Sequence, residues 1–205
     1  MIKKKIGIVN YNAGNIYSIN NSLKFIGCET KILSQKSDMN KIDYLVIPGV
    51  GSYGHCIDHL KRQKFYKLIL KILKQNKIPS LCICIGLQLL GNSSDESPDK
   101  EGLNIFDFKI RKLVSNQENK VPHVGWNEVR FKKNFGNFQK SKKYDFYFDH
   151  SYALFHSNYS LGTSVHAKNF SSLIQNKNIL ACQFHPEKSQ ENGLNFLESF
   201  VNYYG

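Results

Sequence analysis

The chain has 205 residues, 41% of them hydrophobic and 13% aromatic, a composition typical of a globular protein and unlike that of a disordered chain. Its length suits one domain over residues 1–205, and no apolar run approaches the roughly 20 residues that a membrane-spanning helix needs. The formal net charge of +12 would suit nucleic acid, but the basic residues are mostly lysines spread along the chain without interleaved aromatic residues, so we prefer a solvated basic surface.

Short apolar runs alternate with helix-period segments through the first half of the chain. This alternation predicts an α/β fold in which helices cover a mostly parallel sheet. Apolar side chains recur on one helical face over residues 16–26, where Asn15 is placed to cap the helix and Gly27 to end it. A second apolar helical face, which we assign to core packing, covers residues 65–73. The strands expected in this half are residues 5–10, 29–34, 44–47 and 80–83.

The second half of the chain is richer in strand patterns. Runs of β-branched and aromatic residues, separated by Asn, Ser, Lys and Gly, predict strands at residues 126–131, 144–148, 162–167 and 179–184. The composition of residues 91–100 and 132–143 predicts two surface loops. The side chains expected on one side of a final helix are Leu194, Leu197, Val201 and Tyr204.

The cysteines and the N-terminal segment indicate the compartment. Five cysteines are an odd number without the spacing of a disulfide framework, so we expect thiols in a reducing environment. Residues 1–9 carry positive charge but lack the roughly 7–15-residue apolar region of a signal peptide. We therefore expect a cytoplasmic protein.

The most informative stretch is the expected strand-to-helix junction around Cys84. An apolar strand meets Gly86 and passes directly into a helical pattern. A nucleophile on such a turn stands clear of the sheet, and the amides that open the helix point toward an oxyanion formed beside it. The helix N-terminus also favours the thiolate, which is the attacking form. Taken alone, the stretch fits a buried structural cysteine equally well, and Cys82 faces the other side of the strand, which argues against a metal pair.

A histidine and a carboxylate follow another apolar strand far downstream, in the segment His185-Pro-Glu187. A histidine at such a strand end can accept the proton of a thiol and later donate it to a leaving group. A carboxylate two residues on can hold the imidazole in the required tautomer. By itself this short motif is more often an ordinary loop histidine.

A Gly-rich turn, residues 48–52, directly follows the expected strand at 44–47. It lacks the Lys-Ser or Lys-Thr of a phosphate-binding loop, so we do not expect a nucleotide site. Backbone amides in such a turn, if near a nucleophile, suit an oxyanion hole.

The three motifs together resemble those of the triad-type, or class I, glutamine amidotransferases. More narrowly, four further segments are similar to the glutaminase subunits of imidazole glycerol phosphate synthase, an enzyme of histidine biosynthesis. These segments are residues 10–15, 121–127, 150–152 and 183–189. The resemblance extends from residue 6 to about residue 201, nearly the full chain.

The resemblance implies a doubly wound three-layer α/β sandwich with the active site at the carboxyl edge of its strands, and neither a metal nor a cofactor. Cys84 would attack the side-chain amide of L-glutamine to form a glutamyl thioester, His185 would act as acid and base, and Glu187 would orient His185. The residues implied for the oxyanion hole are Val50, Gly51 and Ile85. Those implied for binding glutamine are Gly49, Gln88, Ser151 and Tyr152.

The resemblance also implies a heterodimer with a (β/α)8-barrel cyclase, which receives the ammonia and makes imidazole glycerol phosphate and AICAR. Trp126 would contact this partner, although a core aromatic is an equally good interpretation of that residue. The complete set implied at the interface is Asn12, Asn15, His123, Trp126 and Asn127.

Several positions depart from the common pattern of these subunits. Cys82 stands where Gly is usual, Asp149 where an apolar residue is usual, and Asn10 and Asn12 where Asp and Gly are frequent. None removes a catalytic group, but they leave open a paralogous glutaminase that supplies ammonia for amidation of a surface-polysaccharide sugar. From other functional classes, a catalytically silent assembly partner and an acidic-surface binding module also remain as alternatives. Retention of Cys, His and Glu argues against a silent scaffold.

Overall fold

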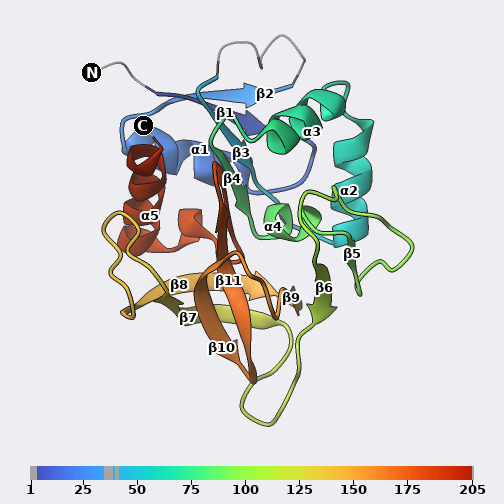
Figure 1. Ribbon diagram of the computed structural model, residues 1–205, viewed down its shortest axis with the longest axis vertical. Coiled ribbons are helices and arrows are strands. Elements are labelled where there is room, and N and C mark those ends of the chain that lie inside the picture. The colour runs from blue at the N-terminus through green and yellow to red at the C-terminus, as the bar shows by residue number, and fades with distance from the viewer. Residues whose placement is uncertain (1–3, 35–38, 40–41, 205) are drawn as a thin grey trace.

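A computed structural model describes residues 4–34, 39 and 42–204, and its centre is a nine-stranded mixed sheet (Figure 1). In spatial order the strands are β2 (Glu29–Leu33), β1 (Lys5–Val9), β3 (Tyr44–Ile47), β4 (Ser80–Ile83), β12 (Ile179–Cys182), β11 (Lys168–Asn176), β10 (Ser160–His166), β7 (His123–Phe131) and β8 (Lys143–His150). Four neighbouring pairs, from β2 to β12, are parallel, and the four pairs from β12 to β8 are antiparallel. We call these two parts the parallel half and the antiparallel half.

The parallel half is buried on both faces except at its edge strand β2. Every residue of β3, β4 and β12 is buried, and in β1 only Lys5 is exposed. Continuous apolar runs of this kind are typical of parallel strands that helices cover on both sides. The α/β fold expected from the sequence is present, with a sheet that becomes antiparallel beyond β12.

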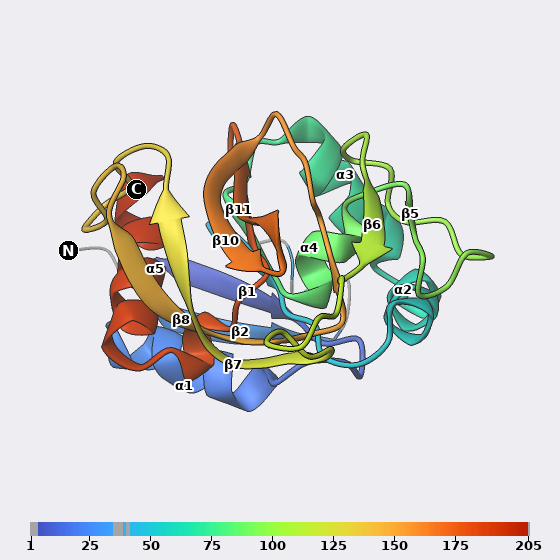
Figure 2. The same ribbon diagram turned by 90° about the horizontal axis from the view of Figure 1, so that it is seen from below.

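Helices cover the two faces of the parallel half (Figure 2). One face carries α1 (Ile16–Phe25) and α5 (Gln190–Tyr203), and the other carries α2 (Tyr53–Arg62), α3 (Tyr66–Gln75) and the short α4 (Ile85–Leu89). As expected, α1 buries Ile19 and Leu23 and ends before Gly27, whose φ of +89° suits glycine. Asn15 occupies the N-cap position of α1, although its side chain makes no cap hydrogen bond there.

Several elements were not expected from the sequence. Helix α2 and strand β11 were missed, and a small three-stranded sheet joins β5 (Ser93–Ser94), β6 (Lys109–Lys112) and β9 (Tyr152–Ala153). The segment at residues 132–143 is a loop, but it is anchored, because Phe135 and Phe138 are both buried and pack near Phe196. No helix within the described ranges is long and apolar enough to cross a membrane.

Candidate active site

A strained turn places Cys84 between β4 and α4. Its backbone has φ +53° and ψ −108°, a conformation that costs a non-glycine residue about 1–3 kcal/mol and that surrounding contacts must hold. The amide of Cys84 donates to the carbonyl oxygen of Cys182 at 2.7 Å, which fixes the turn to the neighbouring strand β12. Two residues later, only glycine fits at position 86, because a Cβ there would overlap the carbonyl oxygen of Ile47.

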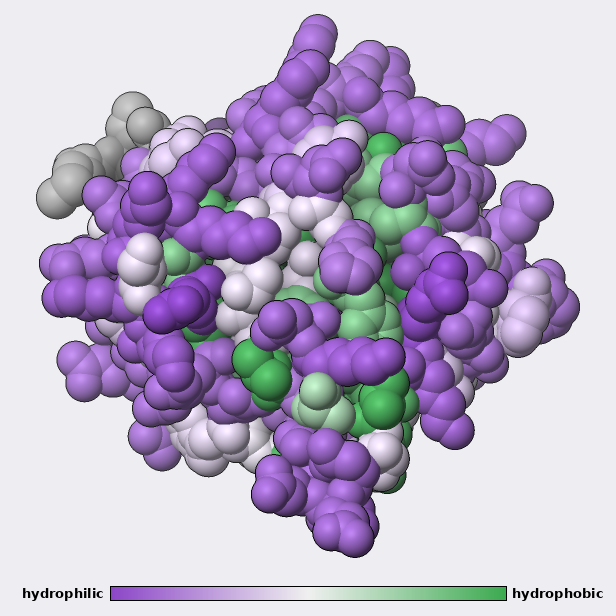
Figure 3. All heavy atoms as spheres, turned by 60° about the horizontal axis from the view of Figure 1, so that its bottom comes forward, coloured by the Kyte–Doolittle hydropathy of each residue, from purple (hydrophilic) through white to green (hydrophobic). Residues whose placement is uncertain are grey.

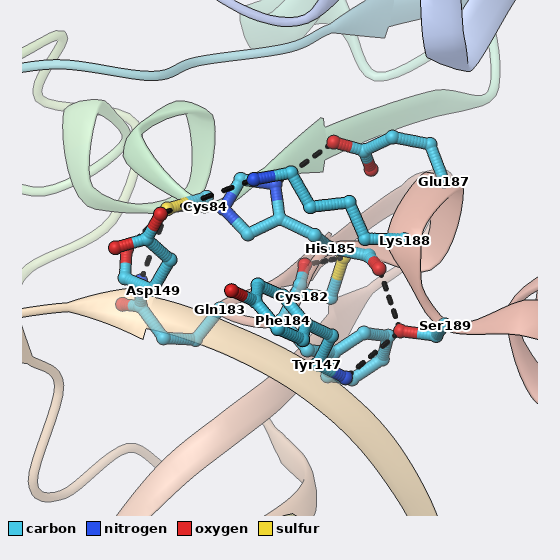
Figure 4. Close-up of polar contacts among 10 residues, drawn as sticks. All are labelled: Cys84, Tyr147, Asp149, Cys182, Gln183, Phe184, His185, Glu187, Lys188 and Ser189. Atoms are coloured by element: carbon cyan, nitrogen blue, oxygen red, sulfur yellow. Dashed lines mark hydrogen bonds and ion pairs between the residues drawn. The ribbon is translucent and has the colours of Figure 1, made fainter. Parts of the chain in front are cut away.

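Parallel pairing of β4 with β12 explains how distant residues meet. Ile83 is in register with Cys182, so the residues that follow each strand emerge at the same edge of the sheet. In Figure 4 the imidazole of His185 lies between the Cys84 sulfur and the Glu187 carboxylate. Nδ1 of His185 and Oε1 of Glu187 are 2.9 Å apart, and both side chains are almost fully buried.

The charge state of His185 depends on these two neighbours. Burial alone lowers the pKa of its imidazole, but the negative charge and hydrogen bond of Cys84, together with those of Glu187, outweigh burial and raise the pKa to about 10. The carboxylate accepts a hydrogen bond from Nδ1–H, so Nε2 is the nitrogen left for Cys84. Both neighbours therefore favour the protonated, positively charged form of the His185 imidazole.

The backbone of His185 is held in position from the antiparallel half. Its amide donates to the carbonyl oxygen of Tyr147 in β8 at 2.8 Å. The hydroxyl of Ser189 donates to the His185 carbonyl oxygen at 2.6 Å and accepts from the Tyr147 amide at 2.9 Å. Two of these hydrogen bonds hold the His185 backbone directly, and the third ties Ser189 to β8.

A pocket of about 220 Å³ opens beside the Cys84 sulfur. Most residues implied for catalysis and for glutamine binding line it. The exceptions are Glu187 and Gly49, and Gly49 packs against Ile85 and Gly86. Two larger depressions lie over β10 and β11, away from the cysteine. The lining residues of the Cys84 pocket are Val50, Gly51, Cys84, Ile85, Gln88, Glu96, Pro122, Asp149, His150, Ser151, Tyr152 and His185.

Two polar groups in this site were not singled out from the sequence. Glu96 lines the pocket and accepts a hydrogen bond from the Tyr53 amide at 2.7 Å, at the start of α2. Gln183 is fully buried, and its Nε2 lies 3.5 Å from the Cys84 sulfur. Glu96 sits in a segment expected to be only a loop, so nothing in the sequence marked it, whereas Gln183 belongs to the 183–189 motif.

Gln88 presents one free acceptor. Its Nε2 donates to the carbonyl oxygen of Tyr152 at 3.0 Å and to Oε1 of Gln183 at 3.1 Å, which uses both of its protons. Its Oε1 is buried and has no partner among the described residues. An unpaired acceptor in a pocket wall is what a donor on a ligand would satisfy.

His150, which lines the pocket, and His123 form a directed hydrogen-bonded chain. Nδ1 of His150 lies 2.9 Å from the carbonyl oxygen of Tyr152 and must donate, so Nε2 of His150 accepts from Nδ1 of His123, also at 2.9 Å. The chain begins at Asn127, whose Nδ2 lies 3.1 Å from Nε2 of His123. Burial lowers the pKa of His123 to about 4 and that of His150 to about 3, so both rings are neutral at pH 7.

The residues implied at a partner interface are placed differently from one another. Trp126 is 48% exposed, which excludes the core-aromatic interpretation. Asn12 is exposed, and Asn15 and Asn127 are partly buried. His123 is only 6% exposed and lies beneath this surface rather than on it.

The Asp149 side chain is exposed and lies 3.9 Å from Nζ of Lys188, so its replacement of an apolar residue leaves no buried charge.

The free cysteines and the metal-binding residue types add no second site. All five cysteines are thiols, and the sulfur atoms of Cys82 and Cys182 are buried in the sheet. Among the residues that the structure describes, no group of three or more His, Cys, Asp or Glu side chains is placed to hold a metal ion.

Comparison with known proteins identifies the family. The profile of the family Glutamine amidotransferase class-I matches residues 8–202. The chain belongs to this family. The subunit HisH 2 of imidazole glycerol phosphate synthase from Vibrio vulnificus is 37% identical over 204 residues, which cover 97% of this chain and 94% of that relative. The HisH subunit from Pelagibacter ubique is 36% identical, with 96% and 99% covered.

Two solved structures share the fold of this class I amidotransferase. The structure of PurLQS from Thermotoga maritima superposes with a TM-score of 0.77 at 19% identity, covering both chains completely. A glutamine amidotransferase crystal structure gives 0.74 at 16% identity, with 96% of this chain and 98% of that chain covered. The resemblance drawn from the sequence motifs is therefore confirmed at the level of family and fold.

Proposed function

We propose that this class I amidotransferase is the glutaminase subunit of an imidazole glycerol phosphate synthase. In this proposal it hydrolyses L-glutamine to glutamate and ammonia and passes the ammonia to a (β/α)8-barrel cyclase, which makes imidazole glycerol phosphate and AICAR in histidine biosynthesis. The observation that carries the proposal is the position of the His185 imidazole between the Cys84 sulfur and the Glu187 carboxylate, at the wall of a small polar pocket.

The proposed reaction has two halves. The Cys84 thiolate attacks the side-chain amide carbon, a C–S bond forms, and the carbonyl electron pair moves onto oxygen. As this tetrahedral species collapses, His185 gives its Nε2 proton to the departing nitrogen, the C–N bond breaks and ammonia leaves. Water then loses a proton to His185 and attacks the thioester, the C–S bond breaks, and the electron pair returns to sulfur. Glu187 keeps the imidazolium oriented throughout.

The oxyanion hole in this proposal uses backbone amides. Ile85 is the first residue of α4, so its N–H has no acceptor within the helix. The second donor would come from Val50 or Gly51, which line the same pocket from the turn after β3. Amides already fixed in such positions stabilise charge that develops on the substrate oxygen.

The polar lining suits the amino acid end of glutamine. Oε1 of Gln88 can only accept a hydrogen bond and has no partner among the described residues, so it suits an N–H of the substrate. The carboxylate of Glu96 supplies negative charge for an α-ammonium group. The backbone of Ser151 and Tyr152 would complete the binding of the substrate. Gly49 would allow the turn after β3 to approach α4, since a Cβ at position 49 would lie 2.7 Å from Cβ of Ile85.

The proposed partner would dock on the outer surface of β7 and its neighbours. Val124 and Trp126 on β7 are 55% and 48% exposed, and Trp126 packs edge-on against Tyr147 of β8. Figure 3 looks onto the lower end of the molecule in Figure 1 and shows apolar side chains gathered in small patches that hydrophilic residues surround. The HisH names of the relatives support the same partner, and a cytoplasmic location fits this biosynthetic role.

The test is ammonia release from glutamine by the Cys84→Ala variant in the complex with the synthase that co-purifies with the chain. We expect the rate to fall by about 10⁴-fold or more, because no other group can form the thioester, whereas synthesis from added ammonia survives. Cys82→Ala, two residues away on the same strand, is the matched control and should remain active. Parental ammonia release by the Cys84→Ala variant would contradict the proposal, and the acceptor used by the partner identifies the pathway.

A further inference from the structure

The Cys84 sulfur has an amide neighbour in addition to His185. Nε2 of Gln183 lies 3.5 Å from this sulfur, and Gln183 is fully buried two residues before the histidine. The carbonyl oxygen of Asp149 lies 3.9 Å from the sulfur, and it can accept a hydrogen bond from a thiol but cannot donate one to a thiolate. Gln183 is therefore positioned to interact with the charged form of the cysteine.

The orientation of the Gln183 amide follows from its surroundings. The carbonyl oxygen of Tyr152 can only accept, so the atom of Gln88 that faces it must be Nε2. The second proton on that nitrogen points to Gln183, so Oε1 of Gln183 must face Gln88. The nitrogen of Gln183 is then turned toward the sulfur. The nitrogen and oxygen of both amides are thus assigned by a chain that starts at a backbone carbonyl.

A hydrogen-bond donor beside sulfur has a definite electrostatic effect. Hydrogen bonds to a charged form favour that form, and they are strong where water is excluded. The donor here is held by Gln88 and does not have to be reoriented when charge develops, which is the condition for effective stabilisation of a reacting group. Its influence is expected both when the thiolate attacks and when it leaves the thioester.

We propose that Gln183 is a catalytic residue of the glutaminase site, and that its amide holds the Cys84 sulfur as a thiolate while Gln88 fixes the direction of that amide. This inference rests on the proposed function for its role in turnover, but its effect on the sulfur can be measured without glutamine. The inference connects the two glutamines: Gln88, which would contact the substrate, also orients the Gln183 amide that faces the Cys84 sulfur.

The experiment follows alkylation of Cys84 by iodoacetamide as a function of pH in the full chain, with the modified peptide mapped by mass spectrometry. Gln183→Leu removes the donor, and we expect the rate at pH 7 to fall by about tenfold and the midpoint of the pH profile to move up by about one unit. Gln183→Glu keeps the acceptor that faces Gln88 but puts negative charge beside the sulfur. Its midpoint should lie above that of Gln183→Leu.

The matched control is Gln175→Leu, which removes an amide that donates to Tyr204 at 2.9 Å, remote from the site. This variant should react as the parent does, and a thermal unfolding curve checks that each variant is folded. A Gln183→Leu midpoint equal to that of the parent would overturn the inference, as would a Gln183→Glu midpoint no higher than that of Gln183→Leu. If the predicted shifts occur but the parental complex releases no ammonia from glutamine, the proposed function fails and the assignment of Gln183 to the sulfur stands.

Discussion

The two halves of the sheet contribute different parts of the site. In the parallel half, Cys84 follows β4 and His185 follows β12, and these adjacent strands deliver both groups to one edge. In the antiparallel half, β8 leads into the segment His150 to Tyr152, which lines the same pocket from the opposite side. The parallel half therefore supplies the reacting groups, and the antiparallel half supplies part of the wall that the substrate would contact.

The difference also extends to solvent exposure. The strands of the parallel half that carry the reacting groups are buried on both faces, so a thiol and an imidazole are held in a low-dielectric surrounding where their charges interact strongly. Strand β7 of the antiparallel half alternates buried and exposed residues and keeps Val124 and Trp126 at the surface. Burial suits the chemistry, whereas the half-exposed strand suits contact with a partner.

The largest expected effect comes from removing the charge of Glu187, which follows strand β12 of the parallel half. Glu187→Gln keeps the shape of the side chain but removes the charge that helps raise the pKa of His185 to about 10. We expect ammonia release to fall by about 10²–10⁴-fold, because the imidazole loses both its orientation and its positive charge. Steady-state assays of the complex measure this. Glu191→Gln on α5 is the control, and a loss below tenfold for Glu187→Gln would contradict the assigned role.

A second change tests the turn itself. Gly86→Ala on α4 places a methyl group against the carbonyl oxygen of Ile47, a backbone atom at the end of β3. We expect the free energy of unfolding to fall by about 3 kcal/mol, as is typical of overpacking against rigid backbone. Urea denaturation followed by circular dichroism gives the value. Gly27→Ala serves as a comparison, because the space around Gly27 is open and only its positive φ would be strained. Equal losses in both variants would contradict the account of the turn.

Acid pH should destabilise the fold through two buried histidines of the antiparallel half, His123 and His150. Burial lowers the pKa of His123 to about 4 and of His150 to about 3, whereas both titrate near 6.5 in the unfolded chain. As the pH falls below about 6.5, the unfolded state binds protons that the folded state refuses, so stability present above pH 6.5 is lost toward pH 4. Between pH 7 and pH 5 this is about 2 kcal/mol for each histidine.

The variant His150→Asn isolates this contribution. Its unfolding free energy, from urea denaturation at pH 7 and pH 5, should change less with pH than that of the parent. His156→Asn, at an exposed histidine, should keep the parental pH dependence. If the His150 variant kept it as well, the neutral histidine chain would be wrong.

The smallest expected effect concerns the surface of the antiparallel half. Trp126→Ala removes an exposed aromatic that packs on Tyr147, and we expect affinity for the synthase partner to fall by about tenfold. Alkylation of Cys84 in the isolated chain should not change. Phe25→Ala, at a 78% exposed aromatic on α1, is the control for binding, which isothermal titration measures. Unchanged affinity in the tryptophan variant would move the interface elsewhere.

The strands that carry the reacting groups were predictable because their sequences are continuous apolar runs. The strands β3 and β4 were predicted with the bounds that the structure has, and the junction after β4 marked Cys84 correctly as the residue at a turn. Pairing of β4 with β12 could not be deduced from spacing, since strand order is set by packing across the whole chain. The family resemblance linked Cys84 with His185, but it did not supply the pairing of the two strands.

The elements and side chains around the reacting groups were harder to predict. Strand β11 was missed because Lys168, Asn169 and Asn176 give it polar ends that read as a connection. Glu96 was missed because it lies in a segment whose composition is that of a loop, although its carboxylate binds the start of α2. His123 was expected at the surface, and its burial depends on a histidine chain whose members come from different strands.

The most direct test of the central claim is to stop the complex with acid during turnover on labelled glutamine and locate the label by tandem mass spectrometry. The account predicts a glutamyl group on the sulfur of Cys84, and an unlabelled peptide from the Cys84→Ala variant. Steady ammonia release with no label on the chain, or with the label on Cys82, would contradict it.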